Sequence, residues 1–135
     1  MVHAMEKLSP KRISEVKNIL DTHDVVEMTV VSNSMEPLIA TGEKILVSSL
    51  LRLKRPLRPF DVVLFVKDQL LICHYIQHLN ALPGPDGRRF IITRGLSTPG
   101  EDLPVYENDV LGLVVSHSIN WVLRVKVLYR SWRDR

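Results

Sequence analysis

The chain passes from an apolar run into a constrained turn in Val25-Val26-Glu27-Met28-Thr29-Val30-Val31-Ser32-Asn33-Ser34-Met35-Glu36-Pro37. Residues 25–31 are rich in valine and predict a strand. Pro37 requires the chain to turn soon after Ser34. A hydroxyl at the end of a strand can stand clear of the sheet and reach a substrate, as a serine nucleophile must. Ser34 is therefore the first candidate for a catalytic residue.

Further apolar runs predict a mainly β fold. They cover residues 44–49, 61–67, 70–79, 89–94 and 110–116, each bounded by turn residues. Residues 67–69 predict a tight hairpin connection, and residues 80–87, rich in proline and glycine, form a second candidate hairpin loop. Six short strands with few helices favour a small, antiparallel-rich β fold.

Both ends of the chain carry helical patterns. Ser9 can cap a helix that has Pro10 at its first position. Ile13, Val16 and Leu20 then repeat at helical spacing, and we expect this helix to end near residues 21–24.

The C-terminal segment, residues 119–135, is basic and amphipathic. If it is helical, one face carries Trp121, Val125, Leu128 and Trp132, with arginine and lysine around it. A basic helix bearing tryptophan can lie on a membrane surface. Two other interpretations stay open: packing into the core, and a homodimer face.

Length and composition predict a single globular domain. The 135 residues are 45% hydrophobic and 24% charged, with a net charge of +3. We expect an N-terminal helical segment (residues 1–24), a β core (25–118) and the basic C-terminal segment (119–135) as parts of that domain.

Cysteine usage and hydropathy predict a cytoplasmic protein. Cys73 is the only cysteine, so no intrachain disulfide can form. The N-terminus lacks the apolar core of a signal peptide, and no apolar run approaches the roughly 18 residues of a membrane span. Membrane association would then be peripheral, through the C-terminal segment.

A serine nucleophile needs a base. The chain offers His3, His23, His78 and His117 as imidazole bases, besides His74. His74 is considered first. It lies in the middle of the predicted strand 70–79, where a histidine is either packed structurally or placed for catalysis. A lysine of lowered pKa, Lys44 or Lys67, is the other option. His74 and His78 share a predicted strand face, but no third ligand accompanies them. We expect neither a metal site nor a cofactor.

Five segments resemble, in order and spacing, the sequence boxes of the signal peptidase I superfamily. These are 34–47 (Ser-Met-x-Pro, then Gly and an acid), 59–65, 73–76, 93–95 followed by Asp102, and 110–115. The resemblance implies a β-rich peptidase fold, a small coiled antiparallel sheet of barrel-like shape. It implies acyl transfer with Ser34 as nucleophile, and it makes His74, where many relatives carry lysine, the leading candidate for the general base. It implies oxyanion donors beside Ser34: the hydroxyl of Ser32 and a neighbouring backbone N–H, for which we consider Met35.

The chain departs from this pattern at several positions. Leu96 replaces the acid of the Lys-Gly-Asp box, so Asp102 is the remaining candidate to orient His74. Glu43, Phe60 and Tyr75 replace the usual aspartate, glycine and arginine. Since no apolar run in these 135 residues is long enough for the membrane anchor of a signal peptidase, we expect no such anchor.

Two hypotheses follow from these observations. The first is a soluble serine endopeptidase that cuts a peptide or protein substrate. The second is an inactive relative that binds an extended peptide at a sheet edge. Repressor-type relatives carry a DNA-binding module before this fold, but residues 1–24 are too few for one, so we expect no nucleic-acid partner.

Overall fold

A single curved sheet dominates the computed structural model, which describes residues 3–4, 7–79, 87 and 89–133. Within these residues the strand order is β1-β2-β3-β8-β4-β5-β6-β7. The strands are β1 (His3–Ala4), β2 (Val26–Val30), β3 (Lys44–Ser49), β4 (Val62–Lys67), β5 (Leu70–Leu79), β6 (Phe90–Arg94), β7 (Val105–Tyr106) and β8 (Val110–Val114). Neighbouring strands are antiparallel except β1, which runs parallel to β2.

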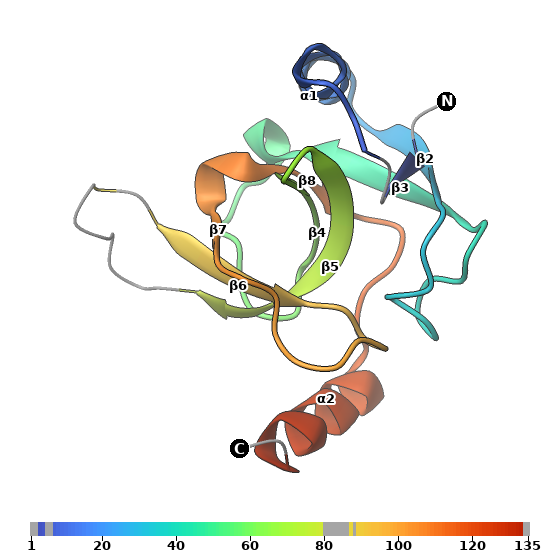
Figure 1. Cartoon of the computed structure of the whole chain (residues 1–135), viewed down its shortest axis with the longest axis vertical. Coiled ribbons are helices and arrows are strands. Elements are labelled where there is room, and N and C mark those ends of the chain that lie inside the picture. Colours follow the sequence, from blue (N-terminus) through green and yellow to red (C-terminus); the bar gives the residue numbers. More distant parts are fainter. Residues whose placement is uncertain (1–2, 5–6, 80–86, 88, 134–135) are drawn as a thin grey trace.

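The prediction of a mainly β fold is confirmed, but the sheet is not a closed barrel. Strands β4 to β8 curl around a common centre (Figure 1), while β1 and β7 form the two edges among the described strands. All six predicted strands are present. The two-residue strands β1 and β7 are too short to give a periodic pattern and were not predicted.

The β4–β5 hairpin is closed by the predicted tight turn. Asp68 and Gln69 both adopt positive φ angles, 52° and 66°, as a two-residue hairpin turn requires. The second predicted hairpin loop, residues 80–87, lies outside the described residues except for Gly87. The strands that flank it, β5 and β6, are antiparallel neighbours.

The described residues include two α-helices, which lie at opposite ends of the molecule (Figure 1). Helix α1 (Pro10–Thr22) begins as predicted: the Ser9 side chain accepts a hydrogen bond from the Arg12 N–H. Its residues Val16 and Leu20 are buried against the sheet. Short 3₁₀ turns occupy Leu50–Arg52 and Glu107–Asp109. Among the described residues, no helix has the length and apolar character needed to cross a bilayer.

Helix α2 (Trp121–Arg133) packs with a different face from the one expected under the core-packing interpretation. Val127 is buried and Leu123 is packed against the core, whereas Trp121, Val125, Leu128 and Trp132 are exposed. The core-packing interpretation of this apolar stripe is therefore wrong. The alternatives of a membrane surface and a dimer face remain.

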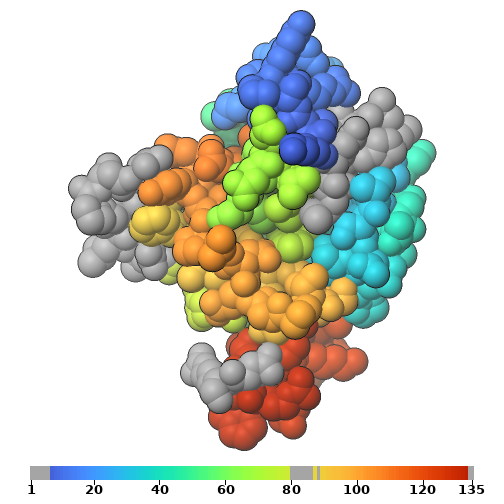
Figure 2. All heavy atoms as spheres, in the orientation of Figure 1, coloured from blue at the N-terminus to red at the C-terminus, as the bar shows by residue number. Residues whose placement is uncertain are grey.

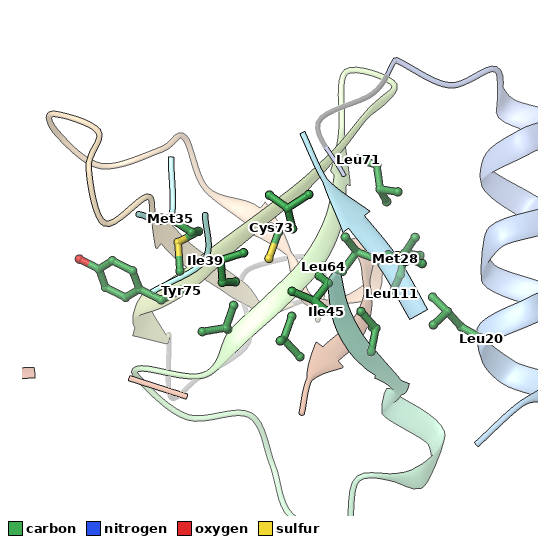
Figure 3. Close-up of a cluster of buried hydrophobic side chains, with 14 of the residues drawn as sticks. Leu20, Met28, Met35, Ile39, Ile45, Leu64, Leu71, Cys73, Tyr75 and Leu111 are labelled. Carbon is green, nitrogen blue, oxygen red and sulfur yellow. The ribbon is translucent and has the colours of Figure 1, made fainter. Parts of the chain in front are cut away.

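The larger core cluster extends from α1 to the turn that follows β2 (Figure 3). Leu20 marks its α1 end. Met35, Ile39 and Tyr75 lie together at the other end and are almost completely buried. Because Met35 and Ile39 enter the core, the turn that carries Ser34 is held against the sheet.

Gly112 in β8 allows a close approach between strands. A Cβ atom there would lie 2.6 Å from Val47 Cγ1 and 2.7 Å from the backbone oxygen of Ser48. Since backbone cannot yield as a side chain can, we predict that Gly112→Ala lowers the free energy of unfolding by about 1–3 kcal/mol. Urea unfolding followed by circular dichroism measures this loss, and an unchanged midpoint would contradict the packing described.

Candidate active site

Ser34, His74 and Asp102 form a continuous line of hydrogen bonds. Ser34 Oγ lies 3.1 Å from Nε2 of His74. Nδ1 of the same ring lies 2.5 Å from Oδ2 of Asp102. The three residues come from the turn after β2, the middle of β5 and the loop between β6 and β7. The structure thus brings together the three candidates for catalytic residues that the sequence predicted.

Local hydrogen bonds fix the turn that carries Ser34. The Glu36 N–H donates to the Asn33 carbonyl over 3.1 Å, and the Ser34 carbonyl accepts from the Ser97 N–H over 3.0 Å. Gly95 lies so close that a Cβ atom there would be 2.8 Å from the same Ser34 oxygen. The loop after β6 therefore clamps the Ser34 turn from outside, while Met35 anchors it from inside.

His74 is both a packed residue and a partner of Ser34, so the two interpretations of it are compatible. It lies in β5 opposite Val63 and is 5% exposed, and the Phe65 ring meets its imidazole edge-on. Ser34 is similarly buried, at 6% exposed. A buried imidazole needs partners for both nitrogens, and Ser34 and Asp102 supply them.

Asp102 is held by hydrogen bonds from two side chains. Besides the contact with His74, its Oδ2 accepts a 2.7 Å hydrogen bond from the Thr93 hydroxyl. The Asp102 N–H also donates to the Thr93 carbonyl. Burial acts to raise the pKa of Asp102, but the hydrogen bonds from His74 and Thr93 outweigh it, so the pKa is lowered. Asp102 is therefore ionised at neutral pH.

An ionised Asp102 determines which ring nitrogen of His74 carries the proton. A carboxylate only accepts hydrogen bonds, so Nδ1 must be the donor. In a neutral ring, Nε2 is then the acceptor and faces the Ser34 hydroxyl. This is the arrangement that a serine nucleophile and a general base require.

Ser32 lies beside the nucleophile, as the resemblance implied. Its Oγ accepts a 3.1 Å hydrogen bond from the Ser34 N–H, and its own hydroxyl proton remains available for donation. The Met35 side chain is in the core, so only its backbone can contribute to a substrate site. The assignments of Ser32 and Met35 as oxyanion residues stay predictions.

Position 96 carries an acid in the sequence pattern that the chain resembles, but Leu96 has a structural role here. It packs against the core, and its carbonyl accepts a hydrogen bond from Arg130 of α2. A second nitrogen of Arg130 donates to the Gly95 carbonyl over 3.3 Å. Arg130 thus ties α2 to the loop that clamps Ser34, while Asp102 contacts His74.

His78 does not share the surroundings of His74. The register of β5 on β6 shifts between Ile76 and His78, so Gln77 is an extra residue in a bulge. The bulge reverses the alternation of faces, and His78 is exposed, 3.5 Å from Glu101. The expectation of a shared strand face is wrong for this reason. A sequence pattern does not show where a bulge occurs.

The other candidate bases have partners of their own. Lys44 forms an ion pair with Glu27, and Lys67 donates to the Pro104 carbonyl. His23 hydrogen-bonds the Ile19 carbonyl at the end of α1. His117 lies between Ser116 Oγ, at 2.7 Å, and Glu43 Oε1, at 2.6 Å. Ser116 Oγ also accepts the Leu46 N–H, which is a structural role.

Sequence reasoning missed Thr93 and Arg130 as supporting residues. Thr93 belongs to the sequence box at residues 93–95, and Arg130 is one of several charges on the amphipathic segment 119–135. Their contacts join elements distant in sequence, and no local pattern indicates such contacts.

No protein-family model matches the chain, and no curated protein matches its sequence.

The lowered pKa of Asp102 predicts a pH-dependent contribution to stability. Because the folded pKa lies below that of an unfolded carboxyl, about 4, ionised Asp102 stabilises the fold above that pH. The contribution is lost as the pH falls through the folded pKa. Asp102→Asn lacks it at every pH. Urea unfolding at a series of pH values should therefore show the largest difference between the two chains near neutrality and convergence in acid. Parallel curves would contradict the assignment.

Proposed function

We propose that the chain is a serine endopeptidase of the signal peptidase I type, in which a histidine replaces the usual lysine base. The observation that supports this proposal most strongly is that Ser34 Oγ and Asp102 Oδ2 contact opposite nitrogens of the buried His74 ring. The open, curled sheet is compatible with that fold, and the ordered boxes of sequence support it.

The reaction follows from the direction of the hydrogen bonds. His74 Nε2 takes the proton of Ser34 as Oγ attacks the peptide carbonyl, and a covalent acyl-enzyme forms. The imidazolium then donates that proton to the leaving amine. Asp102 holds the ring in position and stabilises its positive charge. Water, activated by the same nitrogen, hydrolyses the acyl-enzyme.

The negative charge on the carbonyl oxygen requires donors beside Ser34. The Ser34 nitrogen lies 3.1 Å from Ser32 Oγ, so a substrate oxygen beside them can accept a hydrogen bond from the Ser34 N–H and another from the Ser32 hydroxyl. The Ser34 N–H would exchange its present acceptor for the developing oxyanion. Removing one such donor costs on the order of 10²–10³ in turnover in a well-studied serine protease.

Covalent labelling tests the proposed nucleophile. A fluorophosphonate probe, which reacts with activated serines, should label the wild-type chain, and Ser34→Ala and His74→Ala should each abolish labelling. Asp102→Asn should slow labelling strongly, on the order of 10⁴-fold if this triad behaves as the serine-protease template does. Labelling rates are read by mass spectrometry, and circular dichroism checks that each variant is folded.

Ser116 provides a matched control, since its hydroxyl also contacts a histidine ring that has an acidic partner. Ser116→Ala should therefore be labelled at the wild-type rate. Unchanged labelling of Ser34→Ala, or no labelling of the folded wild-type chain, would overturn the proposal. The latter result would favour the peptide-binding hypothesis.

A further inference from the structure

Helix α2 presents a broad apolar face to solvent. Six large side chains lie on it: Trp121, Val122, Val125, Leu128, Tyr129 and Trp132. The two tryptophans, near opposite ends of the helix, are 73% and 70% exposed. The other side of the helix, through Leu123, Val127 and Arg130, holds it to the protein. The exposed face is therefore fixed in its orientation.

Basic side chains flank this apolar face. At 3.6 residues per turn, Lys126 and Arg133 lie along one border. Arg124 lies along the other, where its guanidinium is 5.0 Å from the centre of the Phe60 ring and donates a hydrogen bond to the Ile119 carbonyl. The sequence from Trp121 to Arg133 contains four basic residues and no acidic one. The combination of tryptophan, aliphatic residues and bordering cations is typical of a helix that lies in a membrane interface.

Charge decides between a lipid surface and a second copy of the chain. Arg130 lies on the packed side of the helix, so two α2 faces packed on each other would bring together six basic side chains, three from each copy, without an acid from either helix. A lipid surface with anionic headgroups complements the same cations, while its acyl region accepts the apolar side chains.

We propose that α2 is a docking helix that lies flat on anionic lipid surfaces. Figure 2 shows α2 at one end of the molecule, projecting beyond the sheet, where a flat surface can reach it. Docking at this end leaves the sheet and α1 clear of the lipid.

The position of α2 connects docking with the proposed active site. One cavity of about 250 Å³ lies between the helix and the Ser34 turn, lined by Pro37 and Leu96 on one side and Leu123 and Val127 on the other. Arg130 joins α2 to the loop that clamps Ser34.

The chain contains two tryptophans, both in α2, so its intrinsic fluorescence reports on this helix alone. Vesicles of phosphatidylcholine mixed with phosphatidylglycerol should shift the emission of the full-length chain to the blue and carry the chain down in sedimentation. Vesicles of phosphatidylcholine alone should do so much more weakly. Lys126→Gln combined with Arg133→Gln should weaken binding to the anionic vesicles on the order of tenfold.

Matched variants separate docking from general hydrophobicity and from catalysis. Val125→Glu with Leu128→Glu should abolish sedimentation while retaining both tryptophans. Leu51→Glu should not, because Leu51 is 77% exposed but lies in a 3₁₀ turn outside α2. Ser34→Ala should bind vesicles normally, so that a failure of the peptidase proposal is distinguishable from a failure of docking.

Two results would overturn docking on lipid. One is the absence of both the fluorescence shift and sedimentation with anionic vesicles. The other is a blue shift that depends on protein concentration, together with a doubled mass in light scattering and no vesicle binding. That second result would assign the face to a homodimer.

Discussion

The buried ring of His74 is the constraint on which the site depends. An imidazole that is only 5% exposed must satisfy both nitrogens within the protein, and here one partner is Ser34 and the other is Asp102. These partners come from opposite ends of the chain's β region. The ring can therefore be satisfied only when the β2 turn and the β6–β7 loop both reach the centre of β5.

Packing and hydrogen bonds around the His74 ring hold Ser34 and Asp102 in contact with it. Met35 fixes the Ser34 turn from the core side, and the close approach of Gly95 fixes it from the other. Thr93 holds Asp102 through its hydroxyl and its carbonyl. The position of Asp102 also accounts for Leu96: an acid in the loop between β6 and β7 contacts His74, and Leu96 is free to pack beneath α2.

The sequence predicted the strands and the three central residues because both leave local signals. The strands are visible as short runs of apolar residues. Ser34, His74 and Asp102 belong to sequence boxes that occur in the order of the signal peptidase pattern. Other features depend on contacts between distant segments. The bulge at Gln77 reversed the face of His78, and the buried face of α2 proved to be the smaller apolar stripe, through Leu123 and Val127. With two apolar stripes on one helix, the pattern alone does not determine which one packs.

The central claim is that Asp102 binds Nδ1 of His74 and Ser34 binds Nε2. Nitrogen NMR of the isotope-labelled chain tests it most directly. The His74 signals are assigned by their loss in His74→Gln. In the neutral ring, observed at a pH above which the His74 nitrogen shifts no longer change, we expect a proton on Nδ1, with the downfield resonance of a short hydrogen bond to a carboxylate, and none on Nε2. A proton on Nε2 with a bare Nδ1, or a ring exchanging freely between the two forms, would contradict it.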